Sequence, residues 1–134
     1  MAFDSVDTII DFLEPVASSV FLNNDEGFNT KQLGNYIDVY TNKFPDVAAA
    51  DLILIGCGEA RGAGVFKTDN SGINAVRAHF YNLYHWHSDV KIADIGNIKP
   101  GASLNDTYSA LQQVLSEVSV LGKKAVILGG SHDI

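Results

Sequence analysis

The stretch KAVILGGSHDI, residues 124–134, decides the fold of this chain. Its apolar run, residues 125–128, is typical of a short strand buried in a sheet. The two glycines that follow allow a sharp turn and a close approach by another group. His132 and Asp133 come next, at the carboxyl end of the strand, where open α/β sheets bind their ligands. The stretch therefore predicts a functional site at this edge of a sheet.

Two more strands are predicted upstream, with a helix after each. Residues 52–55 form a continuous apolar run, as expected for a strand buried on both faces, and residues 90–95 predict the next strand. The helix between them starts near Ser71. It is expected to bury a stripe made of Ile73, Val76, Phe80, Leu83 and Tyr84.

The second helix carries clear signals at both ends. Ser103 and Asp106 have the spacing of a capping box, and Gly122 fits the position just after the helix. Its predicted apolar side consists of Leu104, Tyr108, Leu111, Leu115 and Val118. The resulting β-α-β-α-β order predicts parallel strands with right-handed crossovers, and so a layered α/β sheet at least three strands wide.

Residues 1–50 are interpreted as an N-terminal extension packed on the main domain, which is residues 51–134. In the extension, Val6, Ile9, Ile10 and Leu13 have helical spacing, and Pro15 is expected to end that helix. Residues 32–40 fit either a helical face or an edge strand.

Composition narrows the classes of function. The 134 residues are 46% hydrophobic and 19% charged, so the chain should fold. Its net charge of −7 argues against nucleic acid as a partner. A single cysteine, Cys57, excludes an intramolecular disulfide and fits a reducing cytoplasm. We see no signal peptide, and no stretch approaches the ~20 apolar residues of a membrane helix.

The loop GCGEARG, residues 56–62, is open to three interpretations. It nearly matches a dinucleotide-binding loop, but Arg61 stands where the third glycine is needed. It could instead be a substrate loop in which Glu59 and Arg61 supply charge, or a plain glycine-rich loop at the sheet edge. Cys57, without a clear base nearby, is interpreted as a small buried hydrophobic residue. The two histidines of residues 85–87 make a poor metal pair at that spacing.

Several segments together resemble the ureohydrolase superfamily of arginase, agmatinase and formimidoylglutamase. GGSHD, residues 129–133, is similar to the first metal motif of that family. GEARG at 58–62, GINAVR at 72–77 and IADIGNI at 92–98 resemble family segments in the same order and spacing. Residues 99–108 look most like formimidoylglutamase-type members. The resemblance covers about residues 45–134.

The resemblance implies a three-layer αβα, arginase-like fold with a parallel sheet, of which this chain is the incomplete N-terminal part. It also implies a site with two Mn²⁺ ions that hydrolyses a formimino or guanidino C–N bond. His132 matches one metal ligand. The family's other ligands come from Asp-Ala-His-x-Asp and Asp-x-Asp motifs, which these 134 residues do not contain.

We therefore expect the chain itself to be inactive, and we predict no catalytic residue in it. Its parent would act on a small amidine or guanidine and form a homo-oligomer in the cytoplasm, without nucleic acid or membrane partners. Glu59 and Arg61 are the predicted substrate-binding residues. Two alternatives stay open: an agmatinase- or arginase-like parent, and a non-catalytic α/β scaffold or interaction module.

Overall fold

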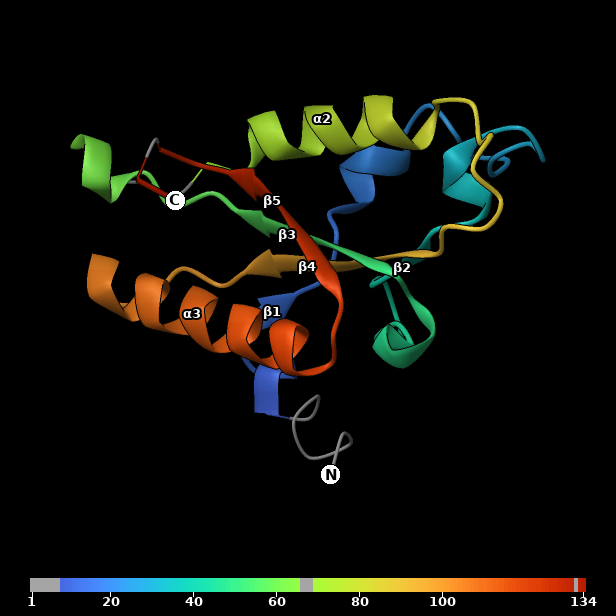
Figure 1. Ribbon diagram of the computed structural model, residues 1–134. Helices are drawn as coiled ribbons and strands as arrows, with labels where there is room; N and C mark the ends of the chain where they lie inside the picture. The colour runs from blue at the N-terminus through green and yellow to red at the C-terminus, as the bar shows by residue number, and fades with distance from the viewer. Residues whose placement is uncertain (1–7, 66–68, 132) are drawn as a thin grey trace.

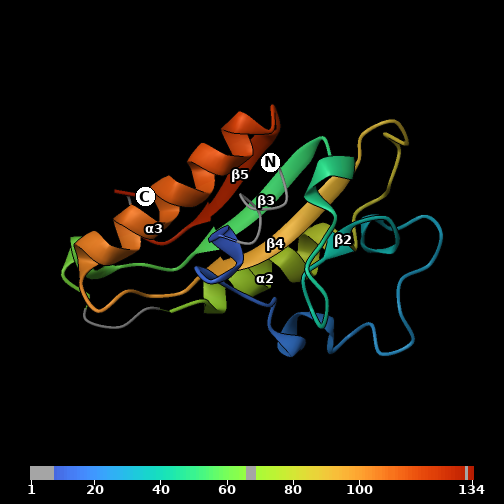
Figure 2. The ribbon, with the colours of Figure 1, turned by 90° about the horizontal axis from the view of Figure 1, so that it is seen from below.

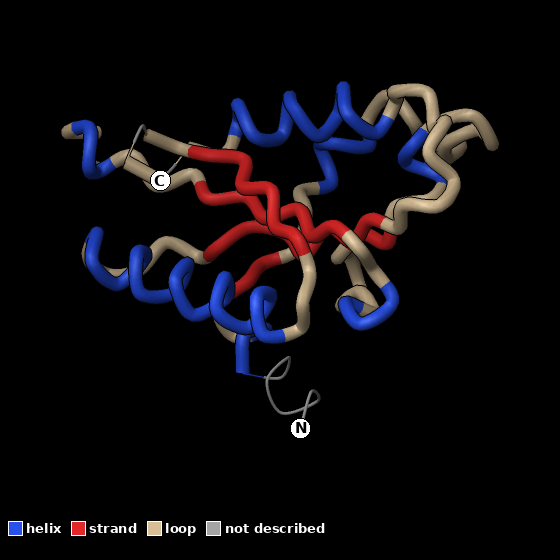
Figure 3. The backbone as a smooth tube through the Cα atoms, viewed as in Figure 1, coloured by secondary structure: helices blue, strands red, loops and turns tan. Residues whose placement is uncertain are grey.

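A mostly parallel sheet forms the centre of the protein. The computed structural model describes residues 8–65, 69–131 and 133–134. In this part of the chain the sheet has five strands in the order β1-β4-β3-β5, and β2 also pairs with β4. Helices α2 (Ser71–Tyr81) and α3 (Leu104–Val120) lie on opposite faces of the sheet (Figures 1 and 3). The expected α/β class is confirmed.

The three predicted strands are present, and they lie side by side (Figure 2). They are β3 (Leu52–Cys57), β4 (Ile92–Ile98) and β5 (Lys124–Gly129). β3 is the central strand and pairs in parallel with both others. Its residues from Ile53 onward are buried on both faces, as predicted.

The second strand starts later than its sequence predicts. Val90 lies outside β4 because its N–H bonds the carbonyl oxygen of His87 at 3.1 Å and closes a turn.

The path of the chain explains why the sheet is covered on both faces. The crossover from β3 to β4 moves one way across the sheet, and the crossover from β4 to β5 moves back past β3. Right-handed crossovers in opposite directions place their helices on opposite faces. The strands β3 and β4 are therefore neighbours whose following helices diverge, and ligands in this class of fold bind at the carboxyl ends of such a pair.

Helix α3 begins and ends as predicted. Asp106 N donates to Ser103 Oγ at 3.2 Å, and Ser103 N donates to Asp106 Oδ2 at 3.1 Å, which completes the capping box. Gly122, with φ of 75°, follows the last turn in the left-handed conformation that glycine adopts at little cost. The buried side of α3 is made of Thr107, Ala110, Leu111, Val114 and Val118.

The predicted apolar stripe of α2 is wrong in part. The helix ends at Tyr81, so Leu83 and Tyr84 lie beyond it and are exposed, and Val76 is exposed as well. The buried face instead carries Ile73, Arg77 and Tyr81. Hydrophobic periodicity missed this face because it scores an arginine as a surface residue.

A buried polar cluster joins α2 to β4. Arg77 Nε and Nη2 donate to the two carboxylate oxygens of Asp94 at 2.8 and 2.9 Å, and both side chains are fully buried. Arg77 Nη1 donates to Asn97 Oδ1 at 2.5 Å, and Nη2 also donates to the Gly96 carbonyl at 2.9 Å. The Tyr81 hydroxyl donates to Asp94 as well. A buried charge is tolerated when it is paired and hydrogen-bonded in this way.

Residues 8–50 add two short strands to the sheet. Residues 8–10 are helical, but β1 (Leu13–Glu14) pairs antiparallel with Ile98 and Asn97. The prediction of a helix through Leu13 is therefore wrong, because pairing with a distant strand overrides local periodicity. Val6 lies outside the described residues.

Residues 32–40 combine both predicted alternatives. A short 3-10 helix, Leu33–Asn35, leads into β2 (Asp38–Val39), which pairs in parallel with Ala93 and Asp94 of β4. The other 3-10 helices described are Ser18–Phe21, Val47–Ala49 and Arg61–Ala63. No helix in the described ranges is long and apolar enough to cross a membrane.

Candidate functional site

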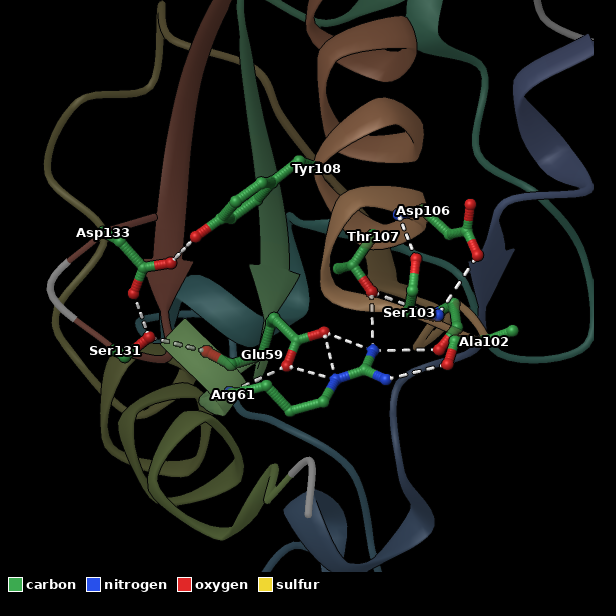
Figure 4. Close-up of polar contacts among 10 residues, drawn as sticks. Glu59, Arg61, Ala102, Ser103, Asp106, Thr107, Tyr108, Ser131 and Asp133 are labelled. Atoms are coloured by element: carbon green, nitrogen blue, oxygen red, sulfur yellow. Dashed lines mark hydrogen bonds and ion pairs between the residues drawn. The ribbon is translucent and has the colours of Figure 1, made fainter. Parts of the chain in front are cut away.

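The loops that follow β3 and β5 meet at the carboxyl edge of the sheet (Figure 4). Ser131 N and Ser131 Oγ donate to the Glu59 carbonyl oxygen at 2.9 and 3.2 Å. A Cβ atom at Gly130 would collide with the backbone carbonyl oxygens of Glu59 and Cys57. Glycine is therefore required for this close approach, as its place in the sequence suggested.

Glu59 and Arg61 form a tight ion pair at this edge. Arg61 Nη2 lies 2.5 Å from Glu59 Oε1, and Arg61 Nε lies 3.0 Å from both carboxylate oxygens. Glu59 is only 1% exposed. The hydrogen bond from the Arg61 side chain is the main cause that lowers the pKa of Glu59 to about 2. The carboxylate is therefore ionised and held in place at neutral pH.

Arg61 also joins the loop after β3 to the segment that follows β4. Its Nη2 donates to the Gly101 carbonyl at 2.9 Å and to Thr107 Oγ1 at 3.3 Å, and its Nη1 donates to the Ala102 carbonyl at 3.2 Å. Each guanidinium nitrogen of Arg61 thus bonds within the protein. A substrate at this edge would meet a pair that already joins two loops, so direct substrate binding by Glu59 and Arg61 stays a prediction.

Asp133 is held by two hydroxyl groups. Tyr108, in the second turn of α3, and Ser131 both donate to its carboxylate. These bonds, with that from Ser131 the larger contribution, lower the pKa of Asp133 below its ordinary value. Bonding to Asp133 raises the pKa of Tyr108, so its hydroxyl stays protonated and can donate. A Cβ atom at Gly62 would meet the Asp133 carboxylate, which places that carboxylate beside the loop after β3.

Sequence reasoning missed Tyr108 and Ser131 as parts of the site. The spacing of apolar residues predicts Tyr108 on the apolar side of its helix, and the sequence gives no separate signal for its hydroxyl. Ser131 was recognisable only as a neighbour of His132 in the motif. His132 itself lies outside the described residues, although its neighbours on both sides are placed.

Cys57 lies in the core, as predicted. Its side chain is fully buried at the end of β3, and burial raises the pKa of its thiol. A thiol held in its protonated form is a poor nucleophile. Cys57 therefore contributes packing under the site.

The donor groups of the described side chains decide whether two manganese ions fit at this edge. Among residues 8–65, 69–131 and 133–134, no group of three or more His, Cys, Asp or Glu residues is arranged to hold a metal. Glu59 is bound to Arg61, and Asp133 to two hydroxyls. Each Mn²⁺ needs several oxygen or nitrogen donors. The described residues alone therefore do not fit a two-manganese centre, and we derive no hydrolytic step from them.

The sheet and the polar cluster at its carboxyl edge define an α/β protein with a candidate ligand site. Comparisons of the chain with protein-family models, curated proteins and solved structures found no match. The resemblance to ureohydrolases therefore depends on the motifs and on their positions in the fold.

Proposed function

We propose that this chain corresponds to the N-terminal part of a manganese-dependent ureohydrolase, closest to the formimidoylglutamase type, with the family's three-layer arginase-like fold. The parent enzyme would hydrolyse the C–N bond of a small linear amidine or guanidine. The chain alone would supply the first part of the sheet and one metal ligand, His132. It would need further ligands from residues other than those described.

One observation carries the proposal: the GGSHD segment is bound to the GEARG loop at the carboxyl edge of the sheet. The Ser131 backbone and side chain both bond the Glu59 carbonyl, so the residue before His132 is fixed against the loop. Asp133, the residue after it, is fixed by Tyr108. Two segments with separate resemblance to family motifs thus share the edge at which ligands bind in this class of fold.

The roles of the described residues follow from their contacts. Arg61 joins the loop after β3 to the start of α3 and keeps the ends of β3 and β4 at a set separation. Asp133 offers an ionised carboxylate next to His132, where it would add negative charge near a bound cation. Manganese held by His132 together with ligands from other residues of the parent enzyme would lower the pKa of a water molecule and polarise the substrate.

An activity assay on the product of the complete reading frame tests this proposal. We expect manganese-dependent hydrolysis, fastest with formimidoylglutamate and slower with agmatine and arginine. His132→Ala should abolish turnover, whereas His79→Ala, on the exposed side of α2, should leave it unchanged. We expect no turnover from the 134 residues alone. Absence of activity on all three substrates, or full activity of His132→Ala, would contradict the proposal.

Preference for another substrate of the set would favour the alternative parents. Agmatine or arginine as the fastest substrate would indicate an agmatinase- or arginase-like enzyme. The ranking of the three substrates therefore separates the members of the class.

A specific observation favours a second candidate, a non-catalytic interaction module. β5 is an end strand of the sheet and is only partly covered, with Val126 41% exposed. A hollow of about 380 Å³ lies beside α3 and is lined by Leu111, Leu115 and Ile134, among others. Open strand edges and apolar hollows invite association. Light scattering would support this role if the chain is a stable oligomer and the product of the complete reading frame also lacks hydrolase activity. A monomer would argue against it.

A further inference from the structure

A pocket lies at the amino edge of the sheet, opposite to the candidate site described above. Its volume is about 260 Å³, and it opens where the N-terminal residues meet the start of β4. Tyr36, Asp38, Asp46 and residues 49–50 form one wall, and the other wall is formed by His85, Ser88 and residues 90–93. Ligand sites occur preferentially at such junctions between two parts of a fold.

The pocket combines aromatic, apolar and charged walls. The rings of Tyr36 and His85 stack with their centroids 4.1 Å apart and their planes 20° from parallel. Ala50, Ala93 and Ile92 provide apolar surface. A few convergent polar groups around an apolar floor are typical of small-molecule sites.

The acidic groups of this pocket are partly positioned already. Asp46 N donates to Asp38 Oδ2 at 3.1 Å, so the backbone of one aspartate orients the carboxylate of the other. Both residues are exposed at the rim. Asp38 belongs to β2, and the pairing of β2 with β4 therefore fixes its place.

An independent observation at His85 also indicates a missing partner. Its Nδ1 atom is buried and has no hydrogen-bond partner among the described residues. Buried polar atoms are nearly always bonded, and those that are not call for an explanation such as a bound molecule. The residue lines the pocket, so the partner of Nδ1 is expected to be an ordered water or a polar group of a bound molecule.

We propose that this pocket binds a small organic cation, an ammonium compound with an apolar body. Its ammonium group lies between the carboxylates of Asp38 and Asp46, and its apolar body packs beside the Tyr36–His85 pair. Aromatic faces attract cations as well, which adds to the carboxylate contacts.

The charge balance favours a cation over an anion. Of the permanently charged side chains at the pocket, Asp38 and Asp46 are acidic and Lys91 is basic, so acid is in excess. The net charge of −7 on the whole chain acts in the same direction, because it raises the local concentration of cations. The proposal does not depend on the hydrolase activity, since the pocket is at the other edge of the sheet.

NMR titration of the ¹⁵N-labelled chain with three probes of similar shape tests the proposal. The probes are benzylamine, benzyl alcohol and benzoate, added at neutral pH with EDTA present so that no metal contributes. We expect benzylamine to shift signals of residues 36–50 and 85–93 and to bind about tenfold or more tightly than benzyl alcohol. Benzoate should bind most weakly.

Three variants distinguish binding that depends on the aspartate charges from binding that depends only on apolar contact. Asp38→Asn combined with Asp46→Asn should weaken benzylamine binding by about tenfold, because two charge-assisted contacts are lost. Asp25→Asn with Glu26→Gln changes the net charge equally at residues outside the pocket lining, and it should have little effect. Ala49→Leu fills the pocket without changing charge, so it should abolish binding even if the double aspartate variant fails to fold.

Four results would overturn the proposal. They are equal binding of benzylamine and benzyl alcohol, tighter binding of benzoate, signal shifts confined to other parts of the chain, and benzylamine binding that survives Ala49→Leu. None of them depends on manganese, so the proposal can fail while the proposed function stands.

Discussion

Replacing Arg77 by methionine tests the buried cluster that joins α2 to the sheet. Methionine keeps the length and much of the apolar volume of the side chain but removes the charge. The guanidinium donates to both oxygens of Asp94, to Asn97 and to the Gly96 carbonyl, at distances between 2.5 and 2.9 Å. All of these bonds are lost in the variant.

Most of the stability lost in Arg77→Met comes from the Asp94 carboxylate, which stays buried without its partner. Asp94 is fully buried, and Arg77 is the cation paired with it among the residues that the structure describes, so removing Arg77 leaves the Asp94 charge unpaired there. Breaking a buried ion pair by removing one partner costs about 3–5 kcal/mol. Domains of this kind are stable by about 5–15 kcal/mol, so we expect Arg77→Met to lower stability severely.

Two further variants keep the test informative if Arg77→Met does not fold. Tyr81→Phe removes one hydroxyl donor to Asp94 while Arg77 stays, so it should cost about 1–2 kcal/mol. Burial and the nearby Asp94 raise the pKa of Tyr81, which keeps that hydroxyl protonated and able to donate. Arg77→Met combined with Asp94→Asn should cost less than the sum of the two single changes, because the amide carries no charge.

Urea unfolding followed by circular dichroism at neutral pH measures these free energies. Lys99→Met is the matched control, because it removes an exposed cation of similar length and should change stability by less than about 0.5 kcal/mol. The reasoning would be refuted if Arg77→Met cost no more than Lys99→Met, or if the double variant were as unstable as the sum of the singles.

Three other predictions concern the helix cap, acid stability and the glycines. Ser103→Ala removes the capping box and should lower the free energy of unfolding, measured in urea, by about 1 kcal/mol. Ser109→Ala, at an exposed position within α3, should not lower it. The pKa of Glu59 is depressed to about 2, so its stabilisation is complete above about pH 4.5 and is lost as the pH falls toward 2. Glu59→Gln should therefore flatten the loss of stability over this acid range, and an unchanged slope would count against the pair. Gly96→Ala should be strongly destabilising, since φ is +84° and a Cβ atom would strike the Glu14 carbonyl, while Gly72→Ala has open space and should stabilise α2. Equal melting temperatures for these two variants would contradict this.

Local signals predicted the parts of the fold that depend on neighbouring residues. The three apolar runs, the capping box at Ser103 and the glycine after α3 all act within a few residues, and each is present, although β4 starts two residues later than its run predicts. The exposed Val76 and the buried Arg77 show the limit of this approach. Arg77 is buried because Asp94, on another element, provides a partner, and periodicity carries no information about that partner.

Long-range pairing explains the errors in the N-terminal residues. Leu13 has helical spacing with its predecessors, but its pairing with Ile98 makes it part of a strand. The position of the candidate site was predictable from the GGSHD and GEARG segments, since the carboxyl ends of parallel strands share one edge. The sequence does not predict the hydrogen bonds of Tyr108 to Asp133 and of Arg61 to the residues before α3. These bonds depend on how loops that are distant in sequence fold together.

The central claim is that the carboxyl edge carries the first metal motif of a hydrolase, and paramagnetic line broadening tests it most directly. Manganese added to the ¹⁵N-labelled chain broadens the NMR signals of residues near any bound ion, even when binding is weak. We predict selective broadening of residues 57–62 and 129–133, and its loss in His132→Ala. Broadening that leaves these residues untouched, or that is unchanged in His132→Ala, would contradict the claim.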